Sequence, residues 1–146
     1  DGYFAEKQDS LYYIAVICDK MLGYPWQECF DLYLTCYNFD PSRAETLYFI
    51  AEHFLDKKQT HVAEIFLRKA FSLGMPQITM SVRKRIYQYH IPHELLKICY
   101  EKEDWKTGAE CSECIQTHQP ANPLNNQYRS VYFLMNILLL TIHFAT

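Results

Sequence analysis

The sequence predicts an all-α fold built from antiparallel helical hairpins, and three observations lead to this prediction. The 146 residues include only four Gly and six Pro, whereas a β-sandwich needs a turn signal about every 8–12 residues. Apolar residues recur at helical spacing, most clearly in RAETLYFIAEHFLDKKQTHVAEIFLRKAF at 43–71. The same spacing recurs upstream and downstream of this stretch. We therefore expect one domain, 1–146, of helices joined by short connections.

The clearest hairpin is predicted at 42–76. Two antiparallel helices that approach closely need small side chains where they cross and large ones above and below the crossing. Ala51 and Ala63 have the spacing of such a crossing pair. Ser42 and Glu45 have the spacing of a capping box, which would begin the first helix. Gly and Pro at 74 and 76 are expected to end the second helix.

Two further hairpins follow from moving the same pattern along the chain, to 8–41 and to 89–120. Pro41, Pro76 and Pro120 then fall at or within one residue of the same repeat position. This pattern resembles the tetratricopeptide repeat, and the resemblance implies a fragment of an α-solenoid.

Two segments lie outside the three repeats. Extra residues between the second and third repeats predict a short additional helix at about 77–90. The segment at about 124–144 is predicted to form a closing helix on the last repeat. Its apolar run at 131–144 is 14 residues long, shorter than the ~20 residues that span a bilayer. We therefore do not expect a membrane partner, although a truncated membrane segment stays open as the alternative.

A more specific resemblance is carried by FDPSRAETLYFIAEHF at 39–54 and IYQYHIPHEL at 86–95. Both stretches resemble the helical-repeat region that follows the catalytic domain in certain family-2-like glycosyltransferases of bacteria and large viruses. The likeness covers roughly 10–118. It implies an accessory domain, because catalysis in that family depends on a separate nucleotide-sugar domain with an Asp-x-Asp metal motif. The present sequence contains no Asp-x-Asp.

From this resemblance we expect a non-catalytic interaction or scaffold module that is not an enzyme by itself and needs no cofactor. Its partner would be a protein, a peptide or a catalytic domain in the same polypeptide. The alternative is a structural protein that assembles by self-association through its repeat ends and its apolar C-terminal helix. Because the sequence begins with Asp and not Met, we expect a piece of a longer polypeptide.

Composition excludes nucleic acid as the expected partner. The chain has 14 Lys and Arg against 17 Asp and Glu, a net charge of −3, and its basic residues are scattered except at 83–85. That basic triplet is expected to be a solvated helix surface. The six Cys are expected to be free thiols, which weakly favours a cytoplasmic location and leaves the compartment otherwise open.

Two groups of residues have the types and spacing of a metal site or a catalytic site, but we do not expect either group to act as one. Cys111, Cys114 and His118 have spacings that suggest zinc, with Cys99 as a fourth ligand. Three of these would lie on one helix, whereas structural zinc sites draw ligands from two elements, so we expect no metal. His90 and His93 flank Pro92 beside Glu94, but the sequence offers neither a nucleophile nor a second carboxylate nearby for acid–base catalysis.

The first helix of each repeat supplies the candidate binding surface. In tetratricopeptide arrays these helices line a concave face that binds peptides or partner domains. Tyr offers contact area and a hydrogen bond at low entropic cost, so Tyr with interspersed charge favours recognition. The predicted binding residues are Tyr12, Asp19, Glu45, Tyr48, Glu52, His93, Lys97 and Tyr100. That this face is solvated, or covered within the molecule, stays open as the alternative.

Overall fold

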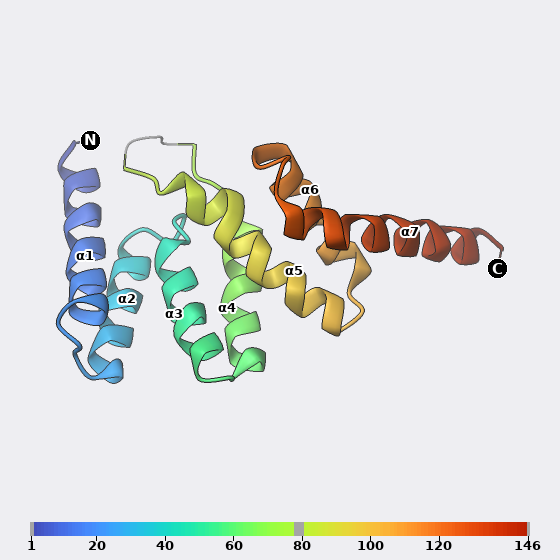
Figure 1. The fold of residues 1–146 in the computed structure, drawn as a ribbon. Coiled ribbons are helices and arrows are strands. Elements are labelled where there is room, and N and C mark those ends of the chain that lie inside the picture. Colours follow the sequence, from blue (N-terminus) through green and yellow to red (C-terminus); the bar gives the residue numbers. More distant parts are fainter. Residues whose placement is uncertain (1, 78–80, 146) are drawn as a thin grey trace. The chain divides into compact units, whose positions relative to one another are not determined.

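The computed structural model describes residues 2–77 and 81–145 (Figure 1). These residues form α-helices and one short π-helix, with no strand among them, so the all-α prediction is confirmed. The helices are α1 (Gly2–Lys20), α2 (Trp26–Phe39), α3 (Glu45–Asp56), α4 (Thr60–Leu73), η1 (Ile86–His90), α5 (Ile91–Glu101), α6 (Trp105–His118) and α7 (Pro123–Ala145).

The chain divides into two compact units, 1–87 and 88–146, and each is described by itself. Unit 1 contains α1 to α4, and unit 2 contains α5 to α7. The expected division into three repeats within a single domain stays a prediction.

The core of unit 1 lies between α1, α2 and α3. Ala15, Cys29, Tyr33 and Ile50 are all fully buried there. The Tyr33 ring stacks on Phe49 at a centroid distance of 5.8 Å and an interplanar angle of 7°. Stacked aromatic rings of this kind add to the free energy gained from burying their apolar area.

Small residues allow α3 and α4 to pack closely. Ala51 on α3 and Ala63 on α4 are both fully buried, as is Leu67 one turn further along α4. Helix α4 ends at Leu73, and its C-cap Gly74 has φ of 65°, a left-handed conformation that Gly adopts without steric cost.

The capping box predicted at the start of α3 is wrong. Helix α3 begins at Glu45 with Ala44 as its N-cap, and no side chain caps it. The Ser42 hydroxyl instead donates to Asp40 Oδ1 at 2.6 Å. The Glu45 carboxylate accepts from the Arg43 guanidinium at 2.8 Å and from the Tyr87 hydroxyl at 2.6 Å.

The additional helix predicted at 77–90 falls partly outside the described residues, because 78–80 are not described. The described remainder has helical turns from Lys84 that pass through η1 directly into α5. Within unit 1, Arg83 attaches this segment to α1. Its guanidinium lies 3.8 Å from the centroid of the Tyr12 ring and its Nη1 lies 3.1 Å from Asp9 Oδ1.

Unit 2 is a hairpin of α5 and α6 with α7 packed on α6. Asp104 caps α6, because its Oδ1 accepts from the Thr107 amide at 3.2 Å. Tyr132 of α7 is 1% exposed and donates its hydroxyl to the Leu96 carbonyl. The Tyr132 ring lies directly over Gly108, where a side chain has no room.

Gly108→Ala should therefore destabilise unit 2. An added Cβ would lie 1.9 Å from the Tyr132 ring, so the ring must move and its bond to Leu96 must lengthen or break. We expect a loss of about 1–3 kcal/mol, the usual cost of overpacking, measured by thermal unfolding in circular dichroism. Gly2→Ala is the control, because nothing lies within 4 Å of its added Cβ. Equal unfolding midpoints for the two variants would contradict the described packing of α7.

Candidate functional site

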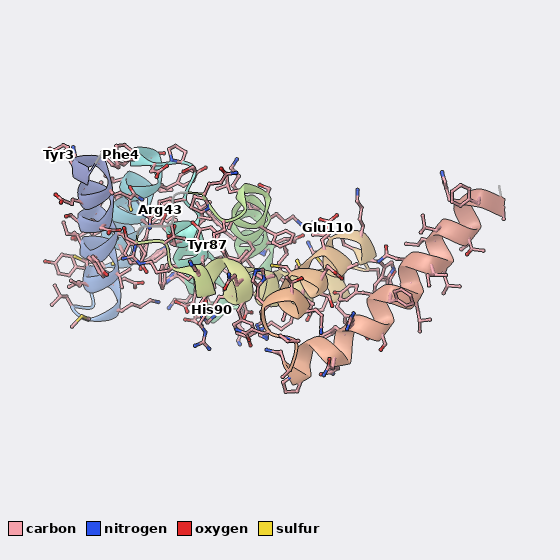
Figure 2. The ribbon with its side chains drawn as sticks, turned by 90° about the horizontal axis from the view of Figure 1, so that it is seen from above. Tyr3, Phe4, Arg43, Tyr87, His90 and Glu110 are labelled. Atoms are coloured by element: carbon pink, nitrogen blue, oxygen red, sulfur yellow. The ribbon has the colours of Figure 1, made fainter. Side chains whose placement is uncertain are left out.

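A buried charged cluster lies at the start of α3 in unit 1. The Glu45 side chain accepts from Arg43 Nη2 at 2.8 Å and from the Tyr87 hydroxyl at 2.6 Å. The Tyr87 oxygen in turn accepts from the Ala44 amide at 2.8 Å. Glu45 is 1% exposed and Arg43 is 7% exposed. Figure 2 labels Arg43 and Tyr87, the two residues whose side chains bind this carboxylate.

The cluster extends to α1 through Asp9. Its Oδ1 lies 3.6 Å from Arg43 Nη1 and 3.1 Å from Arg83 Nη1. The two guanidinium groups of Arg43 and Arg83 therefore meet two carboxylates, those of Glu45 and Asp9. Arg43 also donates to the Ser81 carbonyl at 3.0 Å. Balanced charge and several hydrogen bonds are what a buried ion pair needs in order to offset its loss of hydration.

Titration of the cluster follows from its burial and its bonds. Burial by itself raises the pKa of Glu45, but the hydrogen bonds from Arg43 and Tyr87 outweigh it and the pKa lies below its ordinary value. Burial lowers the pKa of Arg43, and the bond to Glu45 more than restores it. Burial and the neighbouring Glu45 raise the pKa of Tyr87. Arg43 and Glu45 are therefore both ionised at neutral pH. Their bonds connect three segments, namely α1 through Asp9, the start of α3, and 81–87 through Tyr87.

A second polar group joins α1, α2 and α3 at the edge of unit 1. The Tyr33 hydroxyl donates to Asp19 Oδ2 at 2.7 Å. Lys20 Nζ lies 2.6 Å from Glu52 Oε2 and 3.3 Å from Asp19 Oδ2. The Tyr48 hydroxyl donates to Glu52 Oε1 at 3.4 Å. The Lys20 and Glu52 side chains are 39% and 34% exposed, so this group reaches solvent.

In unit 2 the polar residues of α5 form a short ion-pair chain. Glu94 Oε1 lies 3.1 Å from His93 Nδ1, and Glu94 Oε2 lies 2.5 Å from Lys97 Nζ. Burial raises the pKa of Glu94, but the hydrogen bonds from His93 and Lys97 outweigh it, so the pKa is lowered. Tyr100, 40% exposed, belongs to an aromatic group with Trp105 and Tyr128, whose ring centroids lie 6.1 and 5.0 Å away.

The structure places the eight predicted binding residues in three different settings. Three of them are buried and do not form an open surface: Tyr12 at 7%, Glu45 at 1% and Tyr48 at 9% exposed. Asp19 and Glu52 meet at the second polar group, through Lys20. His93, Lys97 and Tyr100 lie on α5 in unit 2. That these residues bind a partner stays a prediction.

Sequence reasoning missed the residues that hold the charged cluster together, namely Asp9, Arg43, Arg83 and Tyr87. The sequence contained one signal for part of the cluster. Arg43 and Glu45 lie two residues apart at the start of a long apolar run, where opposite charges are candidates for a buried ion pair. No local signal connects Tyr87 to Glu45, since these residues are 42 positions apart in the sequence.

The cysteines are arranged as free thiols. None of the six forms a disulfide, and all except Cys114 are buried. Burial raises the pKa of Cys36 to about 11 and also raises the pKa values of Cys29 and Cys114. Residues 2–77 and 81–145 contain no group of three or more His, Cys, Asp or Glu side chains that could hold a metal ion.

Hollows lie in both units. In unit 1 a cavity of about 370 Å³ lies beside Asp9, Asp40 and Arg43. In unit 2 a more open groove of about 640 Å³ runs between α6 and α7, past Glu113, Arg129 and Phe133.

Comparisons of the chain with protein-family models, with curated proteins and with solved structures found no match.

Glu45→Gln should destabilise the protein by about 3–5 kcal/mol, the range for breaking a buried ion pair, because it leaves the Arg43 and Arg83 guanidinium groups to share the Asp9 carboxylate. Glu52→Gln removes the partly exposed pair with Lys20 and should cost less than about 1 kcal/mol. Chemical denaturation at neutral pH measures both changes. A Glu45→Gln loss no larger than that of Glu52→Gln would contradict the cluster.

The advantage of the wild type over Glu45→Gln, measured as the difference between their free energies of unfolding, should also depend on pH. Because the folded-state pKa of Glu45 lies below its ordinary 4.5, the unfolded chain takes up this proton first as the pH falls. The advantage should be complete above pH 4.5 and should decline as the pH falls through the lowered pKa. An advantage that stays constant down to pH 2 would show that the carboxylate is not the stabilising species.

Proposed function

We propose that this chain is a non-catalytic protein-interaction module, the accessory helical-repeat domain of a glycosyltransferase. Three helix pairs support the repeat character of the proposal. The pairs α1–α2, α3–α4 and α5–α6 each pack together, and their connections run only over 21–25, 57–59 and 102–104. Connections this short are typical of antiparallel helical hairpins. Tetratricopeptide-like solenoids are stacks of such hairpins.

The observation that carries the proposal is an exposed apolar stripe on α1. It consists of Ile14 and Ile17 in the second half of α1 and of Met21, the first residue after α1, which are 49%, 40% and 76% exposed. At 100° per residue these side chains fall on one side of α1, whereas Ala15 and Cys18 are buried against the rest of unit 1. A contiguous apolar surface on one side of a helix is typical of a protein interface.

The stripe suits a protein partner with an apolar surface of its own. The resemblance of 39–54 and 86–95 to glycosyltransferase repeat regions supports a nucleotide-sugar catalytic domain as that partner. Self-association is the competing function, because the same stripe on a second copy would offer a matching surface.

Site-specific photo-crosslinking tests the partner. A benzophenone amino acid is placed at Ile14 or Ile17 in the longest polypeptide that carries these residues, and cross-linked peptides are identified by mass spectrometry. Ile65 on α4 is the control, because it is 66% exposed but lies away from α1. We expect cross-links from positions 14 and 17 to a domain that carries an Asp-x-Asp motif. Cross-links to a second copy of 1–146 would support assembly instead, and yields no higher than at Ile65 would contradict both functions.

The chain by itself should neither hydrolyse nucleotide-sugars nor transfer their sugar, with or without Mn²⁺ or Mg²⁺. The reason is that the sequence contains no Asp-x-Asp with which the resembled family holds its metal. Release of nucleoside diphosphate by the purified chain is compared with that of a heat-denatured sample. Turnover above this control would contradict the non-catalytic proposal.

A further inference from the structure

Helix α7 consists of two parts with different surroundings. Its first part, 123–136, packs on the α5–α6 hairpin. Tyr132 donates to the Leu96 carbonyl, and Asn136 Nδ2 donates to the Trp105 carbonyl at 3.0 Å. These two residues are one turn apart and therefore lie on the same face of the helix. On this part, then, one face of the helix carries the packing.

The second part, 137–145, is exposed along its whole length. The consecutive residues Ile137 to Leu140 are 45%, 54%, 48% and 57% exposed, Ile142 is 61% exposed and Phe144 is 84% exposed. Because successive residues point 100° apart, four consecutive apolar residues cover the full circumference of the helix. Within unit 2, this end of α7 extends beyond α5 and α6 (Figure 1).

This distribution identifies the kind of partner that fits. A helix that packs against protein on one side has polar residues on its opposite, solvent-facing side. After Asn136, α7 has no such polar side. A helix that is apolar all round needs an apolar environment on every side, and a lipid bilayer provides one without any matching surface. The only polar side chains after Asn136 in the described residues are Thr141 and His143, and the Thr141 hydroxyl is already bonded to the Ile137 carbonyl at 2.8 Å.

We propose that residues 137–145 insert into the hydrocarbon region of a lipid bilayer, while Tyr132 and Asn136 hold the first part of α7 on α5 and α6. At 1.5 Å per residue the inserted part is roughly 13 Å long, close to half of the ~30 Å hydrocarbon core. Residues 137–145 therefore have the length of about one leaflet. The sequence from 119 to 146 contains no Asp or Glu, and Arg129 is its one basic residue other than His143, so no acidic side chain opposes insertion.

This inference replaces the expectation that the C-terminal run is too short for a membrane. The apolar run of 14 residues belongs to a helix of 23 residues, Pro123–Ala145. By length and composition, its segment Asn126–Ala145 is long and apolar enough to cross a bilayer. The contacts of Tyr132 and Asn136 with the hairpin favour insertion of 137–145 over a crossing by the whole segment.

Vesicle flotation tests the proposal. The protein is mixed with phosphatidylcholine vesicles, with or without one quarter phosphatidylglycerol, and centrifuged through a density gradient. The test variant is Leu138→Asn/Leu139→Asn/Leu140→Asn, and the matched control is Ile14→Asn/Ile17→Asn/Met21→Asn. Both replace three exposed apolar side chains, so neither should change the helicity measured by circular dichroism. We expect wild type and control to float with both vesicle types, and the α7 variant to float at least tenfold less.

A second readout reports insertion directly. Phe144→Trp places a fluorophore at the most exposed of the apolar α7 side chains, and its emission, after subtraction of the wild-type signal, should shift to the blue with vesicles and be quenched by brominated lipid chains. Failure of the wild type to float, equal flotation of the two triple variants, or binding to anionic vesicles alone that 0.5 M NaCl abolishes would each overturn the proposal. None of these outcomes bears on the α1 stripe, which is tested without vesicles.

Discussion

The arrangement of unit 1 depends on one buried ion pair, Arg43 with Glu45. Removing two such charges from water is costly, and the cost is offset only because every strong donor and acceptor in the cluster has a partner. Asp9 brings α1 to the pair, and Tyr87 brings the segment that follows 78–80. Hydrophobic contacts alone tolerate small shifts of one helix along another, whereas these hydrogen bonds fix direction as well as distance. The pair therefore sets the register between segments that lie far apart in the sequence.

Periodicity in the sequence was enough to predict an all-helical fold, and in the α3–α4 hairpin it also singled out two small residues, Ala51 and Ala63, that are fully buried. Ala51 and Ala63 are visible in the sequence because a close crossing restricts side-chain size at fixed spacing. The interactions of Glu45 were not predictable in the same way. A Ser three positions before a Glu is typical of a capping box, and only the three-dimensional position of Arg43 and Tyr87 shows that the carboxylate is used elsewhere.

The predicted binding surface shows the same limit of prediction from sequence. A repeat pattern assigns residues to a face of a helix, but it does not say whether a neighbouring segment covers that face. Tyr12 was expected on an open surface, yet the Arg83 guanidinium lies over its ring.

The placement of the cysteines determines how the chain reacts with electrophiles. Thiol reagents attack the thiolate at a site they can reach, and five of the six sulfurs are closed off inside the helical packing. Cys114 alone is partly accessible, and because burial raises its pKa it reacts slowly at neutral pH. Alkylation of the native chain should therefore begin at this one position, which makes Cys114 a natural attachment point for a spectroscopic label on α6. Reaction at the other five would report that the helices have opened.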